Sequence, residues 1–173
     1  MKVFCSGWGR FETIAVEKGK PILLEKHIER LEKAADFLRL GSCSERGVSK
    51  EKVFSYLAGQ DSEITDHGVL KIVCSAENMF FQMRKNIYSE EDYAKGFVTD
   101  ISKVRRNETS PLVYHKTLNY GDCILEKRAA MAAGINEKVF INTKARSDEG
   151  TVSNIFFDAQ KYDLYTATVL PDY

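Results

Sequence analysis

The sequence has no net charge, no long apolar run and no paired-cysteine motif. Lysine plus arginine and aspartate plus glutamate are balanced at 25 each in 173 residues, so no positive excess draws the chain to nucleic acid or anionic lipid. No apolar run approaches the roughly 20 residues that a membrane-spanning helix needs. These absences predict a protein that binds neither nucleic acid nor membrane.

The four cysteines are scattered along the chain rather than grouped. Cys5, Cys43, Cys74 and Cys123 include no C-x-x-C pair, and no histidine stands at ligand spacing from them. This pattern argues against a metal site and is typical of reduced thiols. The first residues, MKVFCSGWGRFE, also lack the long apolar region of a signal peptide. We therefore expect a cytoplasmic protein without a bound metal.

The composition is that of an ordinary globular protein, with 43% apolar and 29% charged residues. A chain of this length forms one substantial domain or two small lobes with a real core. We find no internal repeat, no low-complexity linker and no coiled-coil pattern.

The first organised stretch predicts a hairpin followed by a helix. FETIAV (11–16) alternates in polarity, EKGK (17–20) is typical of a turn, and PILL (21–24) is interpreted as the return strand. Spacings of three and four residues then predict one buried helix face, with Gly41 as the stop signal. The apolar residues with these spacings are Ile28, Leu31, Ala35 and Leu38.

The remaining elements come in groups instead of strict strand-helix alternation. Ser49 is a suitable N-cap for a second helix, and a later helix is expected between a cap at Asp122 and a stop at Gly134. Because strands and helices cluster, α+β is favoured over a doubly wound sheet. The expected strand segments are a hairpin over 68–86 and strands at 96–102, 138–142, 152–158 and 163–168.

Lys116 lies in VYHKTLNYGD, between a Ser-Pro turn and the expected helix. A free lysine titrates near pH 10.4, so a nucleophilic amine needs burial or a neighbouring cation. Val113, Tyr114, Leu118 and Tyr120 surround it in sequence. Taken alone, the position is more typical of a surface lysine than of a catalytic amine.

Taken one at a time, the other polar residues also favour a structural role over a functional one. Glu149 stands in a polar turn before an apolar strand, and Arg30 lies one turn into the first helix. Arg105 and Arg106 could together bind a carboxylate, or they could be exposed charges on a loop. The three histidines show no ligand or triad pattern, and no phosphate-binding or nucleophile-elbow motif is present.

Three segments in a fixed order carry a stronger signal than any single residue. They are FETIAVEKGKPILLEKHIERL (11–31), RRNETSPLVYHKTLNY (105–120) and INEKVFINTKARSDEGTVSNIFF (135–157). Together they closely resemble the class IV aminotransferases, the fold-type IV pyridoxal-phosphate enzymes. The resemblance runs from about Gly9 to Phe157. It implies a two-lobed α+β fold and a homodimer with its active sites near the interface.

The resemblance also implies roles for individual residues. Lys116 matches the lysine that is joined covalently to pyridoxal 5'-phosphate, and Glu149 matches the acid that pairs with the pyridinium nitrogen. Arg30 matches the arginine that contacts the cofactor phosphate. Tyr120 matches a tyrosine near the cofactor's phenolic oxygen, which the lyases of the family do not always keep. Arg84 and Arg106 are candidate contacts for a substrate carboxylate.

Within the family, FET instead of FEG, together with SPLVYHKTLNY, is most similar to aminodeoxychorismate lyases. The implied reaction acts on a small amino substrate and forms 4-aminobenzoate and pyruvate, a step of folate biosynthesis. A branched-chain or D-amino-acid aminotransferase is the alternative. A further alternative is a truncated, non-catalytic relative that acts as a dimerisation module.

Two features depart from the family pattern. In SGWGR, Ser6, Trp8 and Arg10 replace an aromatic, an acid and a small apolar residue. At the other end, relatives continue through a Gly-Ile-Thr-Arg segment whose helix N-terminus binds the phosphate. We therefore expect an N-terminal lobe over 1–106, an incomplete C-terminal cofactor-binding lobe over 107–173, and weaker cofactor binding than in longer relatives.

Overall fold

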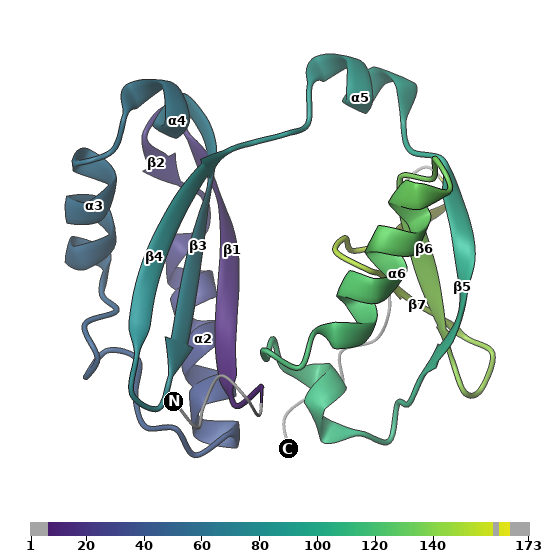
Figure 1. Cartoon of the computed structure of the whole chain (residues 1–173), viewed down its shortest axis with the longest axis horizontal. Helices are drawn as coiled ribbons and strands as arrows, with labels where there is room; N and C mark the ends of the chain where they lie inside the picture. The colour runs from purple at the N-terminus through teal and green to yellow at the C-terminus, as the bar shows by residue number, and fades with distance from the viewer. Residues whose placement is uncertain (1–6, 161–162, 167–173) are drawn as a thin grey trace. The chain divides into compact units, whose positions relative to one another are not determined.

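The computed structural model describes residues 7–160 and 163–166, and it divides the chain into two compact units (Figure 1). The first unit comprises the chain up to Ser89 together with His115–Asn119, and the second comprises the rest. The boundary that the sequence suggested, after residue 106, lies later than this division. The reason is that the strand before it pairs within the second unit.

The first unit contains an antiparallel sheet of four strands in the order β2-β1-β3-β4. These strands are β1 (Gly9–Glu17), β2 (Lys20–Pro21), β3 (His67–Ser75) and β4 (Met79–Lys85). The hairpin expected over 68–86 is therefore confirmed as β3 and β4. Arg10 and Glu12 lie on the same buried face of β1 as Ile14 and Val16.

The expected return strand over 21–24 is wrong in its extent. Only Lys20 and Pro21 pair with β1, and the helix begins at Leu24. Leu23 lies between them with φ of 51°, in the left-handed region, so the strand cannot continue through it.

Helix α2 (Leu24–Phe37) packs on β1, with Leu31 and Ala35 buried as their spacing predicted (Figure 1). Its end differs from the prediction. Arg39, with φ of 52°, is the left-handed residue after the helix, and Gly41 lies two residues further on. The amide of Leu40 donates to the Ala35 carbonyl at 3.0 Å, which closes the helix in a Schellman arrangement.

A second helix, α3 (Lys50–Ala58), starts as predicted, because the Ser49 side chain accepts a hydrogen bond from the Lys52 amide at 3.2 Å. A short helix that the sequence did not predict, α4 (Ser62–Asp66), leads into β3. The buried core of this unit combines the sheet and the helices. Its members include Ile14, Val16, Leu31, Val53, Leu70 and Ile72.

The second unit contains a three-stranded sheet and a separate hairpin. β5 (Thr99–Arg106) runs parallel to β6 (Glu137–Asn142), which pairs antiparallel with β7 (Ser147–Gly150). The hairpin is formed by β8 (Phe156–Gln160) and β9 (Asp163–Thr166). The sequence predicted β6, placed β5 and β8 with shifted bounds, and missed β7. The last two residues of the strand expected at 163–168 lie outside the described residues.

The helices of the second unit are α5 (Glu90–Lys95), a 3-10 turn η1 (Pro111–Tyr114) and α6 (Gly121–Ala132). Helix α6 packs on β5 and β6 (Figure 1). Asp122 does not cap it, because the N-cap is Tyr120 and Asp122 lies in the first turn, where its charge favours the helix dipole. Gly134, with φ of 71°, follows the helix as predicted.

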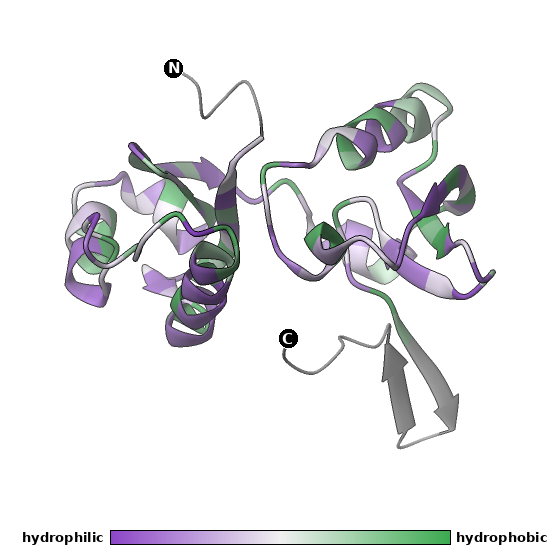
Figure 2. Cartoon of the chain, turned by 90° about the horizontal axis from the view of Figure 1, so that it is seen from below, coloured by the Kyte–Doolittle hydropathy of each residue, from purple (hydrophilic) through white to green (hydrophobic). Residues whose placement is uncertain are grey.

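No described helix is long and apolar enough to cross a membrane. Figure 2 shows hydrophilic and hydrophobic residues interspersed along the helices and strands. Among the described residues, no group of histidine, cysteine or acidic side chains could hold a metal ion. Cys43, Cys74 and Cys123 are buried free thiols, and Cys5 lies outside the described residues.

The core of the first unit gives a direct test of the fold. Leu70 is fully buried in the inner strand β3. Leu70→Ala should lower the free energy of unfolding by about 3 kcal/mol, because it removes apolar contacts and leaves a cavity. Urea denaturation followed by circular dichroism measures this, with the exposed Thr13→Ala on β1 as control. Equal effects of the two substitutions would contradict the assigned core.

Candidate functional site

The segment that carries Lys116 pairs with β1 as a short additional strand. The amide of Phe11 donates to the Lys116 carbonyl at 3.2 Å, and the amide of Leu118 donates to the Gly9 carbonyl at 2.8 Å. Arg10 and Thr117 form an antiparallel bridge between these two hydrogen bonds. The backbone of Lys116 is therefore fixed to a strand whose other edge is held by β3.

The side chain of Lys116 is half-buried and lies against an aromatic ring. Its Nζ is 4.8 Å from the centre of the Phe11 ring, and Nζ of Lys71 approaches the same ring at 4.9 Å. The preceding His115 stacks on Phe37 with 4.0 Å between ring centres, and burial lowers its pKa. These contacts favour a positioned amine over a freely solvated surface lysine.

Arg30 on α2 is held by a buried carboxylate. Its Nε and Nη2 donate to the two oxygens of Glu12 at 2.6 and 2.5 Å, a bidentate pair. His27, one turn earlier on α2, hydrogen-bonds through Nδ1 to the same carboxylate at 2.7 Å. The Glu12 side chain is 1% exposed and that of Arg30 is 53% exposed. The buried Glu12 carboxylate therefore holds the Arg30 guanidinium in place, while part of the Arg30 side chain remains exposed to solvent.

The environment of Glu12 keeps its carboxyl group ionised. Burial works to raise its pKa, but hydrogen bonds from Arg30 and His27 and the positive charge near them outweigh burial and lower the pKa below 4.5. Since a buried carboxylate must be paired, Glu12 and Arg30 depend on each other.

Tyr120 and Glu149 belong to the second unit. The Tyr120 hydroxyl donates to the Thr151 carbonyl at 2.6 Å, and burial raises its pKa, so it stays protonated. Glu149 is exposed on β7, and its amide donates to the Asp148 carboxylate at 3.0 Å. The next residue is Gly150, where a side chain would collide with Ser153.

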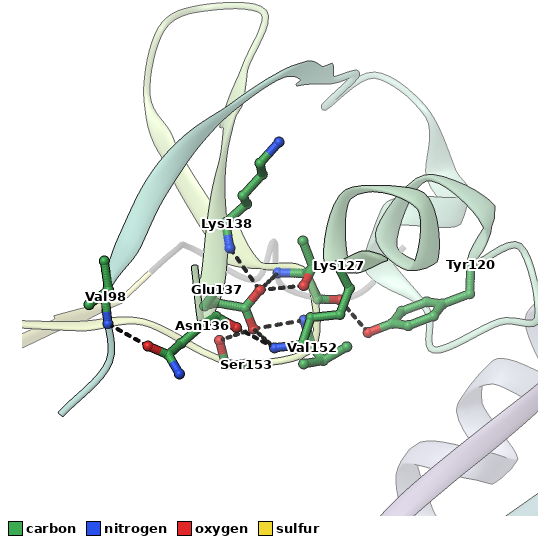
Figure 3. A network of polar contacts seen from close by, with 9 residues as sticks. Val98, Tyr120, Lys127, Asn136, Glu137, Lys138, Val152 and Ser153 are labelled. Atoms are coloured by element: carbon green, nitrogen blue, oxygen red, sulfur yellow. Dashed lines mark hydrogen bonds and ion pairs between the residues drawn. The ribbon is translucent and has the colours of Figure 1, made fainter. Parts of the chain in front are cut away.

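A buried carboxylate, Glu137, organises the loop that follows Glu149 (Figure 3). It accepts hydrogen bonds from the Thr151 hydroxyl and amide, the latter at 3.1 Å, and from the Ser153 hydroxyl at 3.0 Å. Lys127 on α6 approaches it at 3.8 Å. Because Tyr120 donates to the carbonyl of Thr151, the same loop links Glu137 to one of the predicted site residues.

Glu137 is ionised for the same reason as Glu12. Burial raises its pKa, but hydrogen bonds from Thr151 and Ser153 and the charge of Lys127 hold the pKa below 4.5. Its contribution to stability is therefore complete above that ordinary value and is lost as the pH falls through the lowered one.

The two arginines proposed as substrate contacts occupy different environments. Arg84 is exposed on β4 and donates to the carbonyl of Lys85 at 3.1 Å. Arg106 lies over the buried Phe140 ring at 4.4 Å and donates to the Cys123 sulfur at 2.9 Å. Arg106 thus has a packing role within the second unit, whatever it does toward a substrate.

Sequence reasoning missed Glu12, Glu137 and Arg10. The sequence does contain a signal for Glu12 and Arg10. Side chains alternate between the two faces of a strand, so these two lie on the same face as Ile14 and Val16. Buried charges require partners. No such signal marks Glu137, whose partners are set by the loop at 150–153. Of the residues that depart from the family pattern, Trp8 is partly exposed, Arg10 is fully buried, and Ser6 lies outside the described residues.

A comparison with protein families decides the classification. The family described as amino-transferase class IV matches residues 9–169. The chain belongs to the class IV aminotransferases. Enzymes of the class IV aminotransferase family depend on pyridoxal 5'-phosphate. No protein with a curated description matches the chain.

Solved structures of class IV proteins share the fold. A 4-amino-4-deoxychorismate lyase from Pseudomonas aeruginosa is 24% identical with a TM-score of 0.71, covering 90% of this chain and 60% of that one. A fold IV transaminase from Curtobacterium pusillum is 25% identical with a TM-score of 0.72, covering 89% and 56%. A PLP-bound hypothetical aminotransferase from Mycobacterium tuberculosis is 21% identical with a TM-score of 0.67, covering 87% and 58%.

These likenesses confirm the α+β, fold-type IV architecture that the sequence predicted. The chain spans about three fifths of the length of these class IV structures.

Substituting Glu137 tests its role in the second unit. Glu137→Gln should lower the free energy of unfolding by about 2 kcal/mol at pH 7. The side-chain NH₂ group of glutamine is a donor, and it would face the Thr151 and Ser153 groups, which are donors as well. The difference from the unchanged protein should shrink as the pH falls below the usual carboxyl range. Urea denaturation at several pH values measures this, with the exposed Glu149→Gln as control. A loss that is independent of pH would contradict the assignment.

Proposed function

We propose that this chain is a pyridoxal-phosphate enzyme, and specifically an aminodeoxychorismate lyase that forms 4-aminobenzoate and pyruvate. The observation that carries the proposal is the position of Lys116, whose backbone is fixed to β1 and whose half-buried amine lies over Phe11. The match to the class IV family over residues 9–169, a range that includes Lys116, supports it.

The side chains present fit the chemistry of pyridoxal 5'-phosphate. When bound, this cofactor supplies a ring that accepts the electron pair left by a removed proton. Lys116 offers the amine that would hold it and then take a proton from the substrate. Arg30, positioned by Glu12 and partly exposed, offers guanidinium donors to a phosphate. Glu149 offers the carboxylate that would keep a ring nitrogen protonated.

The second candidate is an aminotransferase of branched-chain or D-amino acids. Tyr120 favours it, because the resemblance places this tyrosine in aminotransferases more regularly than in lyases. The Tyr120 hydroxyl donates its proton to the Thr151 carbonyl. To interact with a cofactor oxygen, it would have to turn toward that oxygen or contact it through a water molecule whose hydrogen bond it accepts. The FET and SPLVYHKTLNY segments favour the lyase.

We also propose a cytoplasmic homodimer that acts in folate biosynthesis, as the resemblance implies. The non-catalytic alternative retains self-association but lacks cofactor binding. Sedimentation of the purified chain tests self-association, and absorbance of pyridoxal 5'-phosphate that sediments with the protein separates the two alternatives.

Absorbance spectroscopy tests the lysine assignment. Wild-type protein mixed with pyridoxal 5'-phosphate should develop a near-visible band of the covalently held cofactor, and Lys116→Ala should abolish it. Lys71→Ala is the matched control, since Lys71 approaches the same Phe11 ring at nearly the same distance. Loss of the band in Lys71→Ala with retention in Lys116→Ala would refute the assignment, as would a wild type without any band.

Titration with the cofactor tests the phosphate assignment. Arg30→Met should weaken binding about tenfold to a hundredfold, the effect of losing a hydrogen bond from a charged group. Glu12→Gln should weaken it less, because the guanidinium remains but loses its ionic anchor. Arg39→Met, an exposed arginine just beyond α2, serves as control. Equal affinities for Arg30→Met and the control would exclude Arg30 from the phosphate site.

A product assay decides between the two reactions. Release of 4-aminobenzoate supports the lyase, and amino-group transfer from D-alanine, L-glutamate or L-leucine supports the aminotransferase. Lys116→Ala should remove whichever activity is found.

A further inference from the structure

The Lys116 amine belongs to a short, turned segment of the first unit. The Thr117 amide donates to the His115 carbonyl at 2.9 Å, so Lys116 is the central residue of a three-residue turn. Within the described residues, the backbone hydrogen bonds that join this segment to β1 are made by the Lys116 carbonyl and the Leu118 amide. Both groups lie at or after Lys116, so these bonds do not fix the chain before it.

The ring of His115 supplies an anchor for the residue before Lys116. It stacks on Phe37 with ring centres 4.0 Å apart and an angle of 17° between the two planes. In the described part of the chain, neither imidazole nitrogen of His115 forms a hydrogen bond. Burial lowers the pKa of this imidazole, so the ring is neutral at pH 7. Stacking between two neutral rings is therefore the interaction that holds the His115 side chain.

Phe37 is a rigid partner because it is the last residue of helix α2. The buried Leu38 follows it, and the amide of Leu38 donates to the Ala34 carbonyl at 3.1 Å. Phe37 also lies about two helical turns after Arg30, on the same side of α2. One helix therefore carries both the ring that contacts the Lys116 segment and the guanidinium proposed for the cofactor phosphate.

We propose that the His115–Phe37 stack positions the Lys116 amine, which makes both rings positioning residues for the covalent attachment of an aldehyde cofactor. This inference rests on the proposed function, in which Lys116 holds pyridoxal 5'-phosphate. The stack fixes the residue before Lys116, the pairing with β1 fixes those after it, and the amine lies over Phe11. A restrained amine reacts with a bound aldehyde without first losing conformational freedom. The family resemblance assigns no role to either ring.

A stack with only a structural role would have a different effect. Its loss would lower the free energy of unfolding but leave nearly all molecules folded, because the stability of a native protein exceeds the contribution of one aromatic pair. The reactivity of the Lys116 amine in the folded protein would then stay the same. That reactivity therefore separates a positioning role from a structural one.

The deciding experiment uses the purified chain without cofactor. Trace acetylation with acetic anhydride, read by mass spectrometry, gives the labelling rate of Lys116 relative to Lys71, which approaches the same Phe11 ring from β3. Phe37→Ala and His115→Ala should each raise this ratio about fivefold, because the loss of an aromatic pair frees the amine. The double variant should show no larger change than either single one, since the two rings act as one pair.

Two further variants serve as controls for the acetylation ratio. His115→Phe should keep the wild-type ratio, because a phenylalanine ring can stack and the described chain shows no hydrogen bond for it to lose. Phe54→Ala, which removes an exposed phenylalanine of α3, should also keep it. A ratio that is unchanged in both Phe37→Ala and His115→Ala, or that rises as much in Phe54→Ala, would overturn the proposal. Phe37→Leu, which has no ring, replaces Phe37→Ala should that variant not fold.

A second experiment measures the consequence for cofactor binding. The affinity for pyridoxal, which lacks the phosphate, is read from the near-visible absorbance band. His115→Ala should weaken the binding of pyridoxal and of pyridoxal 5'-phosphate by the same factor of about five, whereas Arg30→Met should weaken only the latter. An unchanged affinity for pyridoxal in His115→Ala would contradict the positioning role. If the wild type develops no band with either compound, the proposed function fails, and the acetylation ratio still decides whether the stack positions Lys116.

Discussion

The pairing of buried charges on β1 is the constraint on which the first unit depends. This strand turns Arg10 and Glu12 toward the same interior as Ile14 and Val16, where an unpaired charge is not tolerated. Glu12 is paired with Arg30 and His27 of α2, and Arg10 donates to the Cys43 sulfur and the Gly41 carbonyl beyond that helix. The strand, the helix and the loop after it are therefore held by polar contacts as well as by apolar packing.

The second unit repeats this solution with a different element. Glu137, at the start of β6, is buried and collects donors from Thr151 and Ser153, which fixes the loop after Glu149 (Figure 3). In both units a buried carboxylate supports a residue that the family resemblance assigns to the cofactor. These contacts fix the position of Arg30 and of the loop whose carbonyl accepts from Tyr120.

Much of the fold was predictable because local signals agree with it. The spacing of Leu31 and Ala35 marked the buried face of α2, Ser49 capped α3, and Gly134 followed α6. Failures occurred where local signals compete. Leu23 and Arg39 adopt left-handed conformations that their residue types do not announce, so the return strand and the end of α2 were misplaced. Strand β7 was predicted as a polar turn, because its residues are typical of turns and only its pairing with β6 makes it a strand.

The sequence by itself determined the family, since three motifs in a fixed order are a property of the chain and need no coordinates. It also nominated Lys116, Arg30, Tyr120 and Glu149, because their neighbours in sequence carry the resemblance. Only the tertiary structure decided that residues 115–119 pair with β1, that Glu12 anchors Arg30, and that Arg10 donates to the Cys43 sulfur. Such contacts join residues far apart in the chain, and burial gives them their energetic weight, which no local pattern records.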